Sequence, residues 1–141
     1  MAISFQAENI KLPDIKKRNT SAWIKAVAGS YSKTVGEIAY LFCNDDKILE
    51  VNRQYLKHDF YTDIITFDYS EGDKISGDIF ISLDTVISNS QKYSTDYQEE
   101  LYRVIIHGIL HLCGLDDGSE DEKKSMREAE NSALKLLKIN E

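Results

Sequence analysis

The chain has 141 residues, of which 42% are hydrophobic and 29% are charged, and its formal net charge is −7. This length fits one domain that can bury its own core, and no apolar stretch is long enough to cross a bilayer. The negative charge argues against broad, non-specific adhesion to nucleic acid, although it leaves room for a local basic groove.

The first third of the chain predicts two strands that alternate with two helices. Apolar and polar residues alternate at 3–7, which predicts a half-buried strand. A second strand is predicted at 38–43. Between them we expect a helix with Pro13 in its first turn, which ends near Gly29. A second helix follows residue 43, and either Asn44 or Asp45 can cap it.

The rest of the chain predicts a hairpin and then three helices. The strands are expected at 64–69 and 77–81 with a turn at 71–73, and the helices at 83–93, 97–113 and 120–137. There is no internal repeat or evident linker. Together these elements predict a single α+β domain over residues 1–141, with a mixed sheet of about four strands packed by helices.

The helix at 97–113 carries two histidines four residues apart. His107 and His111 therefore project from the same face, one above the other, and can reach one metal ion. Gly114 can take the left-handed conformation that ends a helix, so the chain can turn back and bring Asp116 or Asp117 to face the histidines. Two nitrogens and one oxygen, with a fourth position left for water, are typical of a catalytic zinc site. The alternative is a pair of core histidines on an apolar helix.

The same helix has a core-facing stripe and a second face that carries the histidines. Glu100 lies on the histidine face, two turns earlier. It is a candidate to accept a hydrogen bond from a ligand imidazole or to relay a proton, and the alternative is a solvated carboxylate. Farther along, the many acidic residues of the run 116–130 suggest a solvated face.

Cysteine usage and the N-terminus bear on the compartment. Cys43 and Cys113 lie far apart and form no CxxC pair, which predicts two reduced thiols. Residues 1–6 lack the basic and apolar regions of a signal peptide. We therefore expect a cytoplasmic protein that has no association with membranes.

The spacing H-x-x-x-H-x-x-G-x-x-D resembles the zinc-binding pattern of the metzincin proteases, which end it with a third histidine. This resemblance selects Asp117 over Asp116 as the third ligand. The proteases need a glutamate directly after the first histidine as general base, and here that residue is Gly108. The metal geometry is kept, but a peptidase would lack its base.

Over about residues 36–130 the chain also resembles the YbeY family, bacterial metal-dependent endoribonucleases of ribosomal RNA maturation. The block H-G-x-L-H-L-x-G-x-D matches residues 107–116, and Asp117 stands where the family has a further histidine. Weaker matches flank it, at Asn52, Tyr55, Asp59, 62–67, 77–79, Glu100, Leu101, Met126 and Glu130.

This resemblance implies a zinc-dependent endoribonuclease that is specific for single strands and acts in ribosomal RNA maturation and ribosome quality control. It implies one Zn²⁺ per chain, held by His107, His111 and Asp117, and contact with components of the small ribosomal subunit. Carboxylate oxygen is an accepted zinc ligand, so Asp117 is compatible with metal binding. The nucleophile, either an activated water or the 2′-hydroxyl of the RNA, stays open.

A second departure from the family is Leu56, because the family usually has an arginine after the tyrosine, where it can hold a phosphate. Arg53 and Lys57 are the candidate substitutes for RNA binding. Two other functions stay open: a ribosome-assembly factor that binds RNA and has a structural metal, and a metal hydrolase that acts on another substrate, such as a peptide.

Overall fold

The structure is a computed structural model that describes residues 2–56 and 62–139. The described residues form one four-stranded sheet, in the order β1-β2-β4-β3, and five helices. β1 pairs with β2 in parallel, β2 with β4 in parallel, and β3 with β4 antiparallel. The predicted α+β fold with a mixed four-stranded sheet and a hairpin is therefore confirmed. The strands are β1 (Ala2–Ala7), β2 (Thr34–Cys43), β3 (Ile64–Asp68) and β4 (Lys74–Ser82).

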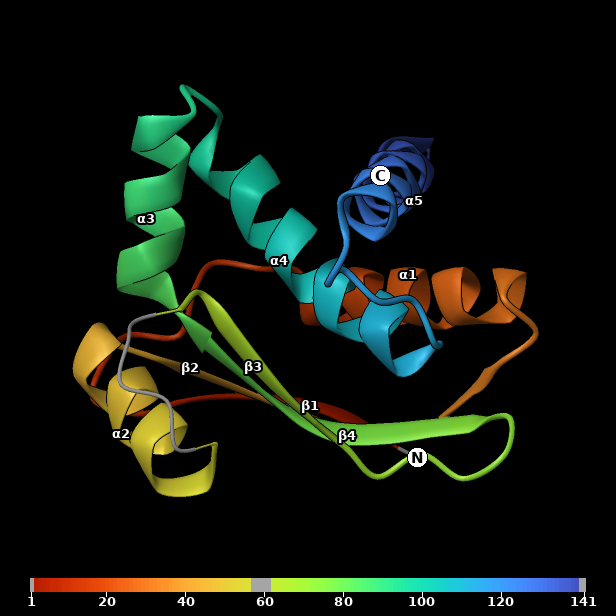
Figure 1. Ribbon diagram of the computed structural model, residues 1–141, viewed down its shortest axis with the longest axis horizontal. Helices are drawn as coiled ribbons and strands as arrows, with labels where there is room; N and C mark the ends of the chain where they lie inside the picture. Colours follow the sequence, from red (N-terminus) through yellow and green to blue (C-terminus); the bar gives the residue numbers. More distant parts are fainter. Residues whose placement is uncertain (1, 57–61, 140–141) are drawn as a thin grey trace.

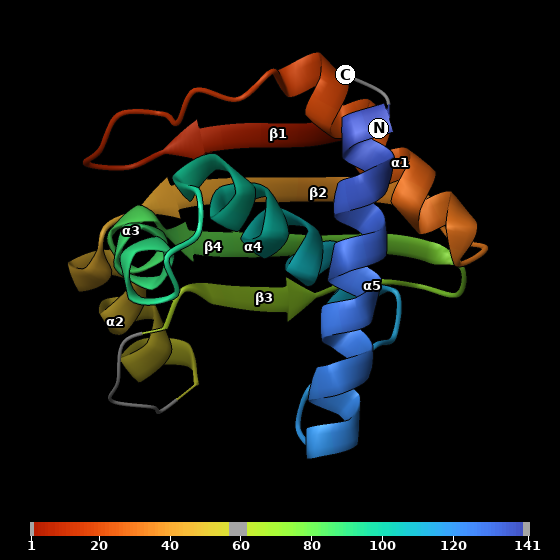
Figure 2. The same ribbon diagram turned by 90° about the horizontal axis from the view of Figure 1, so that it is seen from above.

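Four of the helices lie on one face of the sheet, and α2 lies on the other (Figures 1 and 2). α4 runs across the middle of the sheet, and α5 crosses the C-terminal half of α4. None of the described helices combines the length and the apolar character needed to cross a membrane. The helices are α1 (Lys17–Ser30), α2 (Asp45–Tyr55), α3 (Leu83–Lys92), α4 (Tyr97–Leu112) and α5 (Glu120–Ile139).

Alternation along β2 and β4 builds the main core beneath α4. Ile38, Tyr40 and Phe42 are buried at every second position of β2, because side chains of a strand alternate between the two faces. The Tyr40 hydroxyl donates a hydrogen bond of 2.8 Å to the carbonyl oxygen of Ile105 on α4. This buried contact fixes the helix that carries the two histidines over the sheet.

α5 is fastened to the body of the protein by its buried stripe. Met126, Ala133 and Leu134 are buried, and their helical spacing places them on one face of α5. The Trp23 indole N–H donates a 2.7 Å hydrogen bond to the carbonyl oxygen of Ala133. α5 thus has a defined position relative to α1 and to α4, the helix that carries the two histidines.

Three predicted boundaries are wrong, and one of them is the start of β4, which lies at Lys74 rather than at residue 77. α1 begins at Lys17, so Pro13 is not in its first turn; instead, the Pro13 carbonyl oxygen accepts a 2.9 Å bond from the Ile15 N–H in a turn before the helix. β2 begins at Thr34 rather than Ile38, and a register irregularity between Val35 and Ile38 interrupts the alternation that marks a strand in the sequence.

The alternative left open at the start of α2 is resolved. The side-chain oxygen of Asn44 accepts a 2.9 Å hydrogen bond from the Lys47 N–H, so Asn44 is the N-cap. Asp45 has a different role, because its carboxylate accepts bonds from Ser82 and Thr85 at the start of α3.

Candidate active site

A cavity of about 500 Å³ contains both histidines of α4. It lies between α4, α5, the start of β3 and the C-terminal end of α3, and Asp117 lines it as well. The fold therefore brings His107, His111 and Asp117 to one cavity, which excludes the alternative of two histidines enclosed in the apolar core.

The end of α4 is closed by the predicted glycine. Gly114 has φ +107°, and the Leu115 N–H bonds the Leu110 carbonyl oxygen at 3.1 Å, the pattern of a Schellman motif. This turn places the Leu115 carbonyl oxygen 3.1 Å from Nδ1 of His111. Because a carbonyl oxygen can only accept, Nδ1 of His111 carries the proton and Nε2 is left as the nitrogen that can bind a metal.

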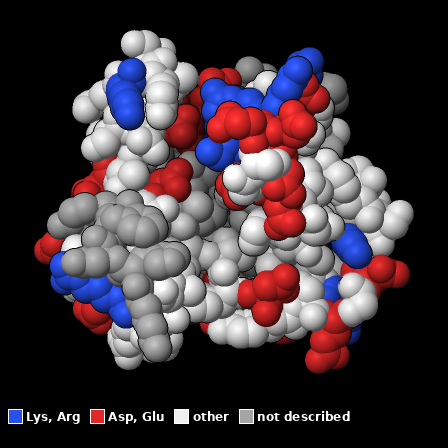
Figure 3. Space-filling view, in the orientation of Figure 1, with Lys and Arg blue, Asp and Glu red and all other residues white. Residues whose placement is uncertain are grey.

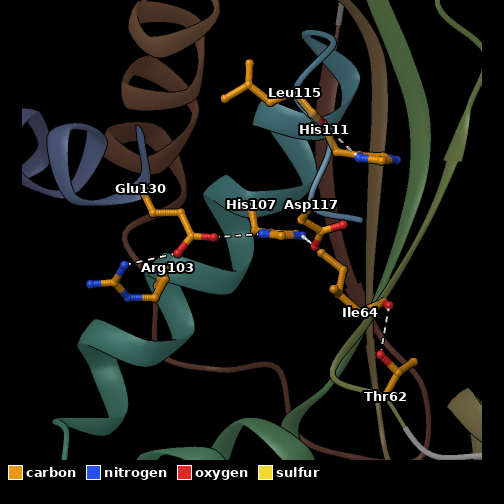
Figure 4. Close-up of polar contacts among 8 residues, drawn as sticks. All are labelled: Thr62, Ile64, Arg103, His107, His111, Leu115, Asp117 and Glu130. Carbon is orange, nitrogen blue, oxygen red and sulfur yellow. Dashed lines mark hydrogen bonds and ion pairs between the residues drawn. The ribbon is translucent and has the colours of Figure 1, made fainter. Parts of the chain in front are cut away.

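His107 is held by a carboxylate that comes from α5 (Figure 4). Its Nδ1 lies 2.7 Å from Oε2 of Glu130, and Oε1 of Glu130 accepts a 3.0 Å bond from Arg103. Arg103 also donates a 2.9 Å bond to the side-chain oxygen of Asn131. An imidazole that donates its second N–H to a carboxylate is the usual arrangement around a metal ligand.

Sequence reasoning missed this function of Glu130. It placed the run 116–130 on a solvated face, whereas Glu130 is 6% exposed. It also considered Glu100 as the acceptor for an imidazole, and the structure gives that contact to Glu130. A signal was present, because Glu130 lies four residues after Met126 and three before Ala133, on the buried stripe of α5.

The returning loop brings Asp117, rather than Asp116, to the histidines. Oδ2 of Asp117 lies 3.4 Å from Nε2 of His107, and the Asp117 side chain is 49% exposed. Asp116 is exposed and does not line the cavity. The geometry favours the choice made from the sequence, and the ligand role of Asp117 stays a prediction.

The side chains offer the ligand types that zinc binds, although they are not arranged around a single metal position. In the described part of the chain, no three His, Cys, Asp or Glu side chains are arranged to hold one ion. Two imidazoles with Nδ1 already bonded and one carboxylate are nevertheless the nitrogen and oxygen ligands that zinc accepts. The residues therefore fit the metal by their chemistry.

The electrostatics of the cavity favour a cation. Burial would lower the pKa of His107, but the hydrogen bond to Glu130 and the charges of Glu130, Asp117 and Asp63 outweigh it, so the pKa is raised. Burial raises the pKa of Asp63, and the charge of His107 opposes this change. A divalent ion placed here would relieve the repulsion among these carboxylates.

Glu100 lines the same cavity and is 8% exposed, so the alternative of a solvated carboxylate is wrong. Burial raises its pKa, the charges of Arg103 and Arg127 lower it, and the charge of Asp63 raises it. Among the described residues its carboxylate has no hydrogen bond. A buried carboxylate of this kind is suited to proton transfer.

Position 108 faces the sheet and not the cavity. A Cβ added to Gly108 would lie 3.0 Å from Cδ1 of Ile79 and 3.2 Å from Cδ1 of Ile64. A glutamate at this position would therefore point into the core between α4 and the hairpin. This agrees with the prediction that the protein lacks the general base of a metzincin-like peptidase.

Of the two predicted RNA-binding residues, Arg53 does not line this cavity and lies at another place on the surface, and Lys57 is not among the residues that the structure describes. Arg53 is on α2, in a separate surface depression, and Leu56 caps that helix and is 41% exposed. Lys57 and Asp59 lie outside the described residues. Two basic residues that the sequence reasoning missed line the cavity, Arg103 from α4 and Arg127 from α5.

The chain is an α+β protein with a histidine–carboxylate site at the end of a helix that packs on a mixed sheet. The chain belongs to the family described as endoribonuclease YbeY, whose model matches residues 2–138. The resemblance seen in the sequence is therefore confirmed, and it extends over nearly the whole chain. The predicted enzyme class, an RNA-cleaving hydrolase, is confirmed with it.

Curated relatives named endoribonuclease YbeY support this membership. The protein from Bacteroides fragilis is 64% identical over 138 residues, which cover 98% of this chain and 99% of the relative. The Phocaeicola vulgatus protein is 65% identical over 137 residues, with 97% and 99% covered. The solution structure of a Thermotoga maritima protein shares the fold, with a TM-score of 0.67, 24% identity, and coverage of 99% of this chain and 93% of that one.

Proposed function

We propose that this endoribonuclease holds one zinc ion through His107, His111 and Asp117 and cleaves single-stranded RNA in the maturation and quality control of ribosomal RNA. The observation that carries the proposal is the orientation of the two imidazoles. Both have Nδ1 bonded to a protein acceptor, at 2.7 Å to Glu130 and 3.1 Å to the Leu115 carbonyl oxygen. Both therefore offer Nε2 to a ligand in the cavity.

A bound zinc would supply Lewis-acid chemistry, because it polarises a phosphate oxygen and makes a water more acidic. The protein supplies the rest. Glu130 keeps His107 in the correct tautomer, while Arg103 keeps Glu130 in place and neutralises it. Since the three proposed ligands do not yet surround one point, Asp117, on its exposed loop, is the side chain best able to move in when the ion binds.

We assign the proton transfer to Glu100. Its raised pKa and its lack of a hydrogen-bond partner within the described chain allow it to take a proton from the attacking hydroxyl. That hydroxyl is either water or the ribose 2′-hydroxyl. Arg127, which lines the same cavity, is the residue best placed to contact a phosphate of the substrate.

Membership of the endoribonuclease YbeY family supports the proposed substrate and setting. Ribosomal RNA, in contact with components of the small subunit, is the proposed target, and the cytoplasm is the proposed compartment. Cys43 and Cys113 are both free thiols in the structure, as expected for a reducing compartment.

The test is incubation of zinc-loaded and chelator-treated protein with single-stranded RNA, with His111→Ala protein as the control for contaminating nuclease. We expect cleavage only by the zinc-loaded protein, and no hydrolysis of casein. RNA binding without cleavage, unchanged after zinc is restored, would instead support an assembly factor with a structural metal.

A further inference from the structure

One exposed aromatic side chain stands at the edge of the cavity. Among the exposed large hydrophobic residues that the structure describes, which are Tyr55, Leu56, Tyr69, Ile87 and Tyr93, only Tyr93 lines the cavity that holds the histidines. Tyr93 is 60% exposed. It therefore presents an apolar surface to whatever enters the cavity, which the core packing of the protein does not explain.

Tyr93 is held by the end of α3. It is the C-cap residue of that helix, and its N–H bonds the Asn89 carbonyl oxygen at 3.0 Å. A side chain on a bonded helix end loses less entropy on binding than one on a free loop. The ammonium of Lys92 lies over the ring, 5.4 Å from its centre, so a cation already contacts the aromatic surface.

Asn89 adds a polar group next to this ring. It lies one helical turn before Tyr93, is half-buried, and lines the same cavity. An amide side chain both donates and accepts hydrogen bonds, which matches the edge of a nucleobase. The C-terminal end of α3 thus combines a flat apolar surface with a bidentate polar group.

The two long sides of the cavity differ in chemistry. The α3 side carries the ring and the amide, and the α5 side carries Arg127. In Figure 3 this face is hollowed between α3 and α5, and acidic and basic side chains gather along the α5 side. A nucleotide has the same division, because its base is flat and its phosphate is anionic.

We propose that Tyr93 and Asn89 form a base-binding subsite, in which an unpaired base of the RNA stacks on the Tyr93 ring and Asn89 contacts the edge of that base. The proposal rests on the proposed function of the cavity. Base-on-aromatic stacking requires a base that is free to leave its neighbours, which a duplex does not offer. The subsite therefore supplies a physical reason for selectivity toward single strands.

The direct test is fluorescence titration of a short single-stranded RNA that carries one 2-aminopurine, whose emission is quenched when it stacks on a ring. His111→Ala protein serves as the background, so that the RNA stays intact. Tyr93→Ala in this background should weaken binding roughly 5- to 150-fold and reduce the quenching. Tyr93→Phe should retain both, because the ring and not the hydroxyl makes the stack.

Tyr69→Ala is the matched control. Tyr69 is 59% exposed, almost the same as Tyr93, but it does not line the cavity. Its substitution should leave binding and quenching unchanged. With otherwise unchanged enzyme, Tyr93→Ala should raise KM more than it lowers kcat, and Asn89→Ala should change the order of preference among the four bases.

The outcomes separate this proposal from the proposed function. If Tyr93→Ala binds and quenches like the parent, or if Tyr93→Phe loses as much as Tyr93→Ala, the base subsite is wrong even though the enzyme cuts RNA. If zinc-loaded parent protein neither binds nor cuts single-stranded RNA, the function of the cavity is wrong. Equal loss of single-stranded and duplex RNA binding in Tyr93→Ala would contradict the stacking mechanism.

Discussion

Two clusters of polar side chains in this protein differ in what they leave open. The Asp45 cluster, made of Asp45, Ser82, Asp84 and Thr85, joins the N-terminal ends of α2 and α3 to the end of β4. Oδ1 of Asp45 accepts 2.6 Å bonds from the hydroxyls of both Ser82 and Thr85, and the Asp45 N–H donates to Asp84 at 3.0 Å. Its donors and acceptors are used within the protein, so the cluster serves stability.

The cavity cluster consists of Glu100, Arg103, His107, His111 and Glu130. Only some of its hydrogen-bonding atoms have partners within the protein. Arg103, Glu130 and Nδ1 of His107 form a bonded line, and Nδ1 of His111 is bonded to the backbone. Nε2 of His107 lies 3.4 Å from Oδ2 of Asp117, and His107, His111 and Glu100 line the cavity. A polar cluster thus indicates function when its hydrogen bonds hold some atoms in place and leave others available to a ligand.

The largest expected effect on cleavage comes from removing an imidazole that is proposed to bind the metal. His107→Ala and His111→Ala should each lower the cleavage rate by more than about 100-fold, because ligand loss costs at least as much as loss of an outer-shell partner. Initial rates on single-stranded RNA measure this. If a variant keeps zinc-dependent cleavage, the histidine that it lacks is not a metal ligand.

The next largest effect, on zinc affinity, comes from Glu130, which holds His107 in place. Glu130→Gln should weaken zinc binding by roughly 10- to 100-fold, measured by competition with a chelator, while the metal-free protein stays folded. Glu130→Ala should in addition destabilise the protein by about 3–5 kcal/mol, since it leaves the Arg103 guanidinium, 11% exposed, without its carboxylate. Equal zinc affinity in Glu130→Gln and the parent would show that Glu130 does not position His107.

The Asp45 cluster should behave in the opposite way. Asp45→Ala leaves the buried Ser82 hydroxyl and the Thr85 hydroxyl without their acceptor, so the free energy of unfolding should fall by about 1–3 kcal/mol. Zinc content and cleavage by the folded fraction should not change. Urea denaturation and metal analysis of the same preparation check both statements, and a parallel loss of zinc would break the distinction between the clusters.

The smallest effect is a pH dependence of the metal-free protein. The pKa of His107 is raised in the folded state, so its pairing with Glu130 contributes stability that is fully present below the unfolded pKa of about 6.5. This contribution is lost as the pH rises through the raised value. The difference in unfolding free energy between the parent and Glu130→Gln should therefore shrink as the pH rises from about 6, and a difference that grows with pH would contradict the pairing.

Local patterns predicted the fold and the parts of the site that lie close together in the sequence. The spacing of His107 and His111 and the turn at Gly114 depend on one helix and its cap, so their geometry follows from helical periodicity. Alternation likewise predicted the sheet, except where the irregularity after Val35 hides the start of β2.

The parts that the sequence did not reveal depend on how distant elements pack. Glu130 reaches His107 only because α5 crosses α4, and this crossing is fixed by the Trp23 bond to Ala133 and by the buried stripe of α5. Arg127 and Tyr93 enter the cavity for the same reason, from two helices on opposite sides of it. No local pattern encodes such a meeting of three helices.

The zinc site proposed for His107, His111 and Asp117 is tested by the zinc content of purified protein, with Asp117→Ala and Asp116→Ala compared at equal protein concentration. We expect one zinc per chain in the parent and in Asp116→Ala, loss of most zinc in Asp117→Ala, and retention in Asp117→His, since imidazole is also a zinc ligand. If Asp116→Ala loses the zinc and Asp117→Ala keeps it, the assignment of the third ligand is contradicted.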